Sequence, residues 1–157
     1  MRTPGIISRR EWMGRLGGGV ACGALRLMAG DAKPQTVNWP TLQTLDFNVP
    51  AAKQKAAALQ LAGKRVSIPG FMVPLEDDLS AVTEFLLVPY AGACIHVPPP
   101  PPNQIVYVKM NKNAKVHVTF TDPILVTGTL QIITMESPYG DVSYDLSGET
   151  VNPYQPQ

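Results

Sequence analysis

Cysteine, charge and long apolar runs are all scarce in this chain, and each scarcity excludes a class of protein. Only two of the 157 residues are cysteines, which is too few for a small domain held together by disulfides. The uncharged window between Arg15 and Arg26 holds only the ten residues 16–25, whereas a membrane-spanning helix needs about 20. We therefore predict no membrane span.

Basic residues are scarce beyond the first 32 positions. Five of the 13 basic and two of the 12 acidic side chains lie in residues 1–32, which leaves eight basic and ten acidic side chains in the remainder, where Arg65 is the sole arginine. A protein that binds nucleic acid needs a basic face to displace counterions from phosphates. The charge pattern thus argues against a nucleic-acid partner.

Residues 1–32 have the features of an export signal. An arginine-bearing start precedes a weakly apolar stretch and a small-residue end at Gly30–Ala32. Ser8–Met13 resembles a twin-arginine signal, so we expect a periplasmic protein whose mature part begins near Lys33. A disordered or amphipathic N-terminal extension is the alternative interpretation. Val20–Cys22 matches a lipidation site poorly, because Gly19 stands where leucine is expected, and we predict no lipid anchor.

Proline and glycine are abundant, with 16 and 13 residues. This abundance favours short elements joined by many turns. The remaining residues 33–157 are enough for one domain of ordinary size with a real core. One short helix is predicted over Asn48–Gly63, because Asn48 can cap it, Pro50 suits its first turn, good helix formers follow and Gly63 ends it.

After Gly63 the apolar pattern changes to the alternation of β-strands. With one helix before the strands and no alternation of helix and strand, a small OB-like barrel of five or six strands is favoured. Gly70 and Gly128 are expected where strands bend. The predicted strand segments are Arg65–Ile68 continuing after a bend into Phe71–Leu75, Val82–Val88, Asn103–Met110, Val116–Phe120, Ile124–Met135 and Val142–Leu146.

Three segments, Val66–Glu76, Glu84–Pro98 and Asn103–Val106, resemble a bacterial exported family catalogued as domain of unknown function 3299. The similarity extends over roughly Leu59–Tyr144. Members of that family are periplasmic and are often encoded beside genes of ABC transporters for metal homeostasis. The resemblance therefore implies a periplasmic, metal-related role beside a transport system or other metal-handling proteins.

The segment around Cys94 is the best candidate for chemistry. If Cys94 and His96 lie on one strand, their side chains point to the same face. A thiolate and an imidazole are ligands for zinc, and soft sulfur also suits copper(I). His117 is the first choice for a further ligand. Other candidates are Glu84, Asp77 and Asp78, or Met72 and Met110 for copper(I).

Cys94 also has interpretations that involve no metal. Once the export signal containing Cys22 is removed, Cys94 has no partner for an intrachain disulfide. Deep burial, an intermolecular disulfide or a reactive thiol activated by a histidine would each account for it. The five prolines Pro98–Pro102 favour a stiff strap that fixes this segment, with a proline-rich ligand for a partner protein as the alternative.

Two functions thus follow from the residues and the resemblance together. The first is a non-enzymatic periplasmic binding or accessory protein in zinc or copper handling. The second is a thiol enzyme or redox protein that uses Cys94 with a histidine. No nucleophile elbow, phosphate loop or paired catalytic carboxylates are recognisable, so the sequence favours the non-enzymatic function.

Overall fold

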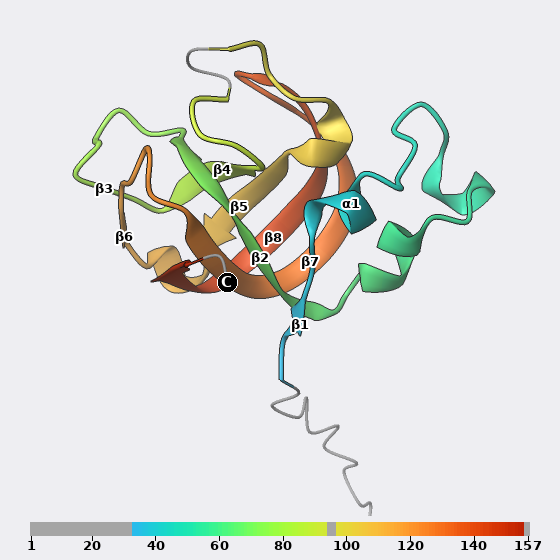
Figure 1. Ribbon diagram of the computed structural model, residues 1–157, viewed down its shortest axis with the longest axis horizontal. Coiled ribbons are helices and arrows are strands. Elements are labelled where there is room, and N and C mark those ends of the chain that lie inside the picture. Colours follow the sequence, from blue (N-terminus) through green and yellow to red (C-terminus); the bar gives the residue numbers. More distant parts are fainter. Residues whose placement is uncertain (1–32, 94–96, 156–157) are drawn as a thin grey trace, which may run out of the picture. The chain divides into compact units, whose positions relative to one another are not determined.

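The computed structural model describes residues 33–93 and 97–155 (Figure 1). The predicted export signal, and the positions of Cys94 and His96, lie outside the described residues. Among the described helices, none has the length and apolar character needed to cross a membrane.

Five strands close into a ring, in the order β2–β4–β5–β8–β7 with β7 returning to β2. All pairs in the ring are antiparallel except β5 with β8. This confirms the prediction of a small, mainly β, OB-like barrel. The strands are β2 Arg65–Pro74, β4 Glu84–Val88, β5 Val106–Met110, β7 Ile124–Ser137 and β8 Gly140–Pro153.

The other elements are short and lie around this ring. β1 extends the sheet beside β2, and β3 pairs with β6 in a separate two-stranded sheet. They are β1 Gln35–Thr36, α1 Trp39–Leu42, β3 Ala81–Val82, β6 Val116–His117 and the 3-10 helices Ala51–Lys53, Ala57–Leu61, Pro102–Gln104 and Asn111–Asn113.

β2 changes partner at its bend. Residues 65–70 pair with β7, whereas residues 71–74 pair with β4. Gly70 lies at the change, and a side chain there would come within 2.7 Å of the Val88 carbonyl oxygen. The expectation that a glycine marks the bend is confirmed, because the strand must pass close to its neighbour where it turns to serve a second side of the barrel.

Alternation along the strands creates two apolar clusters on opposite sides of the barrel wall. The interior cluster includes Phe85, Leu87 and Tyr144, all fully buried. A second cluster lies on the outer face and includes Val73, Leu86 and Ile105, together with part-buried side chains of the β7–β8 hairpin. The barrel therefore has a second apolar layer on its outer face, and the central residues of that layer are themselves buried.

The helix predicted over Asn48–Gly63 is two 3-10 helices instead. Gln54 is extended, and its side-chain amide donates to the carbonyls of Asp46 and Val49 while its oxygen accepts from the Asp46 amide. These hydrogen bonds take the place of the backbone bonds of an α-helix. The α-helix that precedes the barrel is instead α1. Ala58 and Leu61 are the buried residues of the second 3-10 helix, which fits its three residues per turn.

Several strand boundaries also differ from the sequence prediction. The predicted strand Val82–Val88 is divided between β3 and β4, and β5 begins at Val106 instead of Asn103 because Pro102–Gln104 forms a 3-10 helix. β6 ends at His117 instead of Phe120. β8 continues to Pro153, although residues 147–153 resemble a polar tail. Pairing with β7 over its C-terminal part, and with β5 as far as Gly148, holds this segment in the sheet. Where the apolar pattern of a segment is too weak to predict a strand, pairing with neighbouring strands determines whether the strand forms.

Candidate functional site

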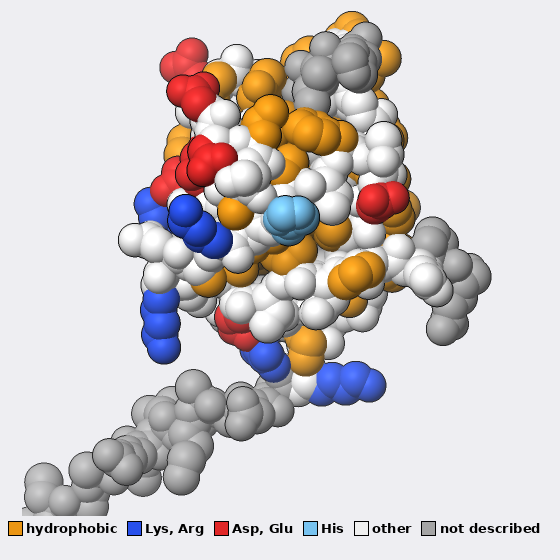
Figure 2. Space-filling view, turned by 90° about the vertical axis from the view of Figure 1, so that its left-hand side faces the viewer, with side chains coloured by type: hydrophobic (Ala, Val, Ile, Leu, Met, Phe, Trp, Pro, Cys, Tyr) orange, Lys and Arg blue, Asp and Glu red, His pale blue; other side chains and the backbone are white. Residues whose placement is uncertain are grey.

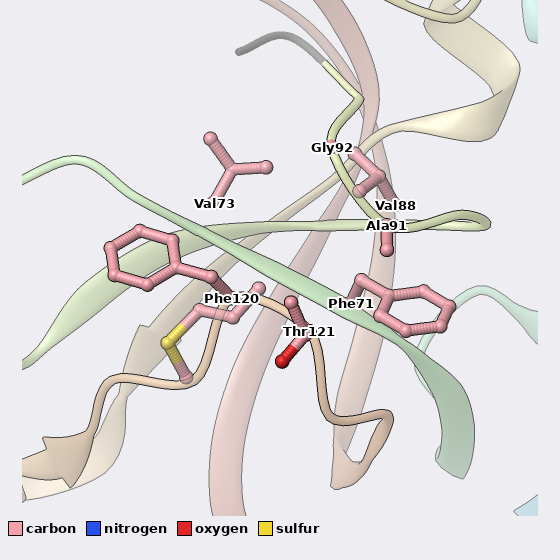
Figure 3. A pocket seen from close by; sticks show the side chains of 8 residues that line it. Phe71, Val73, Val88, Ala91, Gly92, Phe120 and Thr121 are labelled. Atoms are coloured by element: carbon pink, nitrogen blue, oxygen red, sulfur yellow. The ribbon is translucent and has the colours of Figure 1, made fainter. Parts of the chain in front are cut away.

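An apolar pocket of about 490 Å³ opens on the outer face of the barrel (Figure 3). Its walls come from three parts of the chain: the bent half of β2, the end of β4 with the turn that follows, and the segment before β7. In Figure 3 the two phenylalanine rings lie on opposite sides of the pocket. The lining residues are Phe71, Met72, Val73, Val88, Ala91, Gly92, Phe120 and Thr121.

The pocket exists because β2 parts from β7 at Gly70. Beyond this point the chain before β7 turns away, and the space left between Phe71–Val73 and Phe120–Thr121 is the pocket. Gly92 has φ +78°, a conformation that favours glycine and lets the turn after β4 bend over the outer face. Phe120 remains 44% exposed. A large exposed aromatic side chain beside a pocket is typical of a binding surface.

Two further pockets each share one lining residue with the first. One of about 230 Å³ shares Phe71 and is also lined by Trp39 and Tyr154. The other, of about 330 Å³, shares Phe120 and is also lined by Leu79 and Tyr139. All three are lined in part by residues 69–77, from β2 and the turn that follows it.

The acidic turn after β2 lines the third of these pockets. Figure 2 shows acidic side chains beside hydrophobic ones on the face that carries the only described histidine. One carboxylate oxygen of Glu76 accepts hydrogen bonds from the Thr83 amide at 2.5 Å, the Thr83 hydroxyl at 2.8 Å and the Glu84 amide at 2.9 Å. The bond from the Thr83 backbone is the largest cause that lowers the pKa of Glu76. Bonds from Ser80 likewise lower the pKa of Asp78. These carboxylates are therefore charged at neutral pH.

Acid should loosen this turn. The pKa of Glu76 is lower in the folded than in the unfolded protein, so its stabilising contribution is present above the unfolded pKa, about 4.3, and is lost as pH falls through the folded value. Glu76→Gln keeps an acceptor oxygen without the charge and should reduce the loss of stability below pH 4.3. Urea unfolding midpoints between pH 6 and pH 3 measure this. Glu136→Gln, at an exposed position on β7, is the control for the removal of one negative charge.

A polar cluster occupies the outer face of β4, β5 and β8. Glu84 accepts hydrogen bonds from the Tyr107 hydroxyl at 2.6 Å and the Lys109 ammonium at 2.5 Å. The Lys109 bond is the main cause that lowers the pKa of Glu84. Burial, followed by the Glu84 carboxylate, raises the pKa of Tyr107, and burial raises the pKa of the neighbouring Asp145. Both carboxylate oxygens of Glu84 therefore accept a hydrogen bond, one from Tyr107 and one from Lys109.

The candidate metal ligands lie in different places. His117 is exposed on β6, where it pairs with Ala81 of β3. Met72 and Met110 belong to the barrel interior and are only 2% and 4% exposed. Asp77 and Asp78 are exposed in the acidic turn. Over residues 33–93 and 97–155, no three histidine, cysteine or acidic side chains are grouped to hold a metal ion.

Cys94 and His96 are outside the described residues, but the residues on either side of them are defined. Ala93 and Val97 form an isolated parallel bridge, and Ala93 is buried in the outer apolar cluster. After Val97, Pro100 is buried, and the side-chain amide of Asn103 donates to the carbonyls of Gln43 and Leu45 at 3.1 and 2.8 Å. The proline segment is therefore tied down at its C-terminal end.

Phe120 and Thr121 are pocket residues that the sequence analysis did not identify as a site. The alternation of Val116, Val118 and Phe120 suggests three inward-facing side chains. Val116 and Val118 do pack against the interior cluster, but Phe120 does not. The signal available in the sequence is Asp122–Pro123, which ends the extended segment just beyond Phe120.

Comparison with known proteins agrees with this architecture. Residues 31–153 match the family described as "Protein of unknown function (DUF3299)". The crystal structure of a DUF3299 family protein from Pseudomonas aeruginosa PAO1 is similar, with 34% sequence identity and a TM-score of 0.63. The match covers 80% of this chain and 99% of that chain. A search of curated proteins gives no match.

Proposed function

Because this chain belongs to the DUF3299 family, which is defined without an activity, we propose its function from its own residues: it is a non-enzymatic periplasmic binding or accessory protein. The apolar pocket on the outer face carries this proposal. Its walls bind by shape and by burial of apolar surface, and among the described residues that line it Thr121 alone has a polar side chain. Small β-barrels commonly serve as binding scaffolds, although a fold alone does not assign a function.

We further propose that Cys94 and His96 bind zinc or copper(I) and that the protein acts beside a metal transport system. Ala91 and Gly92 line the pocket, and Cys94 follows Gly92 after one residue. The bridge between Ala93 and Val97 fixes the two points at which the chain enters and leaves this segment. Anchored flanks favour metal binding because ligand side chains must be held before the ion arrives.

Metal titration tests this proposal. Protein purified without a tag from a periplasmic fraction should contain zinc or copper, and reduced apoprotein should bind one equivalent. Cys94→Ser and His96→Ala should each abolish that binding, because each variant removes one of the few ligands of the ion. Metal should raise the melting temperature of the wild type and leave both variants unchanged. His117→Ala should also weaken binding if His117 supplies the third ligand.

The thiol-enzyme alternative predicts opposite behaviour of the same cysteine. A thiol activated by a histidine reacts rapidly with iodoacetamide at pH 7. A ligating thiol should be protected until a chelator is added. Rapid alkylation of the metal-loaded protein, or a wild type that binds neither metal under reducing conditions, would contradict the metal site.

A further inference from the structure

The segment Pro98–Pro102 begins with the backbone of a polyproline II helix. Each of residues 97–101 precedes a proline, and each proline fixes its own φ near about −65°, so both torsion angles of residues 98–101 are restricted to this conformation. Pro101 has φ −59° and ψ 156°, and among the described residues no peptide bond is cis. Residues 98–101 belong to no helix or strand of the barrel. The segment is therefore stiff and extended before any partner binds.

One edge of this polyproline II helix faces the barrel, and the other two face solvent. The helix has three residues per turn, so residues 98 and 101 share one edge and Pro100 lies on another. Pro100 is buried, whereas Pro98, Pro99 and Pro101 are exposed. We call these three exposed prolines the proline ridge. In Figure 1 the segment is drawn in yellow at the periphery of the molecule, before a short helix. The ridge is thus displayed on the surface.

The fold holds both ends of the proline ridge. Before it, Val97 forms the isolated bridge with Ala93. After it, the 3-10 helix Pro102–Gln104 packs against β8 and α1, and Asn103 donates its two hydrogen bonds to carbonyls at the end of α1 and in the loop that follows. Binding to a stiff and anchored ridge costs little conformational entropy. The two interpretations of the proline segment are therefore compatible, because the buried edge is the strap and the exposed edges are free for a partner.

The proline ridge offers apolar rings and hydrogen-bond acceptors, and it carries neither donors nor charge. Proline has no backbone N–H. Within the described part of the chain, the carbonyl oxygens of Pro98 and Pro99 accept no hydrogen bond. No aspartate, glutamate, lysine or arginine occurs between Glu84 and Lys109 in the sequence. A complementary surface must supply apolar contact together with N–H or O–H donors, and tryptophan and tyrosine side chains combine the two.

We propose that the proline ridge binds an aromatic-lined groove of a partner protein, in which tryptophan or tyrosine side chains pack against the three prolines and donate hydrogen bonds to the carbonyl oxygens of Pro98 and Pro99. The polyproline II backbone selects a groove of matching shape, the proline rings select aromatic walls, and the unbonded carbonyls select donors. The inference rests on the proposed accessory role and gives the chemistry by which a partner recognises this protein.

A WW domain provides the probe, because its groove for polyproline II ligands is lined by aromatic rings. Isothermal titration calorimetry of the whole protein with this domain should give a dissociation constant below about 1 mM. A hexaproline peptide should compete, since it occupies the same groove of the domain. Because the ridge carries no charge, the dissociation constant should change less than about twofold when sodium chloride is raised from about 50 to about 500 mM.

Two prolines in matched environments locate the site. Pro101 and Pro50 each precede a 3-10 helix, both are exposed, and their backbone angles are similar, with φ −59° and ψ 156° for Pro101 and φ −53° and ψ 136° for Pro50. Pro101→Ala should weaken binding of the WW domain about tenfold, because a few central contacts dominate such interfaces. Pro99→Ala should have a similar effect, whereas Pro50→Ala should have none. Urea unfolding midpoints check that the three variants remain folded.

Three results would contradict the inference: no binding of the WW domain up to about 1 mM, equal effects of Pro101→Ala and Pro50→Ala, or an affinity that falls steeply with salt. Self-association in sedimentation that Pro101→Ala abolishes would assign the ridge to a second copy of this chain instead. Metal titration keeps the two proposals apart, because Pro101→Ala should retain any metal binding of the wild type. A wild type that binds the WW domain but no metal would contradict the metal site alone.

Discussion

Gly128→Ala should destabilise the barrel by about 3 kcal/mol, at the upper end of the cost of overpacking. Gly128 lies at the register shift where β7 passes β8, and an added Cβ would come within 2.3 Å of the Ser147 carbonyl oxygen and 2.9 Å of its carbon. Both contacts are with backbone, so no side-chain rotation relieves them. One of the two strands must move. Urea unfolding monitored by circular dichroism measures the loss.

Gly63→Ala is the control for the loss of a glycine. Gly63 has φ +73°, and a Cβ there would meet no atom within 4 Å. Its replacement should cost only about 1 kcal/mol, from the strained backbone conformation. If both variants lose the same stability, the close approach of β7 and β8 at Gly128 is not what makes that glycine necessary.

Tyr144→Ala should cost about 4 kcal/mol, because it removes a large side chain from the barrel interior. Tyr144 on β8 is fully buried, and its hydroxyl donates to the Leu42 carbonyl at 2.6 Å. Tyr144→Phe keeps the ring and leaves that carbonyl without its donor, at a cost of about 1–2 kcal/mol. Denaturant unfolding of the two variants separates packing from the hydrogen bond. Equal losses would contradict this division.

The pH dependence of the free energy of unfolding in alkaline solution provides a second test of the role of Tyr144. Burial raises the pKa of Tyr144 in the folded protein. Its stabilising contribution is therefore complete below the unfolded pKa, about 10, and is lost as pH rises toward the folded value. Tyr144→Phe should lose less stability than the wild type between pH 10 and pH 11. The residual loss includes Tyr107, whose pKa burial also raises, and Lys109, whose pKa the hydrogen bond to Glu84 raises.

The barrel could be predicted from the sequence because its main signals are local. Apolar patterns identified most residues of β2, β4, β5 and β7 and the first half of β8, and Gly70 and Gly128 identified the bends. The C-terminal half of β8 could not be predicted, since Val151 is the one aliphatic residue between Ser147 and Pro153. That half is held by backbone pairing with strands far away in the sequence, which no local pattern encodes.

The site was predictable only in part, for a similar reason. The segment before and after Cys94 does border a pocket, through Ala91 and Gly92. Phe120 completes that pocket from a segment about 30 residues further along the chain, and its role depends on where β2 and β7 separate. The prediction of a helix over Asn48–Gly63 was wrong because the side chain of Gln54 forms hydrogen bonds with backbone groups of the preceding loop. Helix propensity does not account for such side-chain bonds.

The parallel pairing of β5 with β8 also sets the order in which the fold can form. β8 is inserted between β5 and β7, and its residues 144–148 pair with residues 106–110. During synthesis, β2, β4 and β5 can associate first as an antiparallel meander. The ring cannot close until residues 140–153 have left the ribosome. Such a high contact order favours slow folding, and until closure the β5 edge and the interior apolar face remain available to chaperones or to other nascent chains.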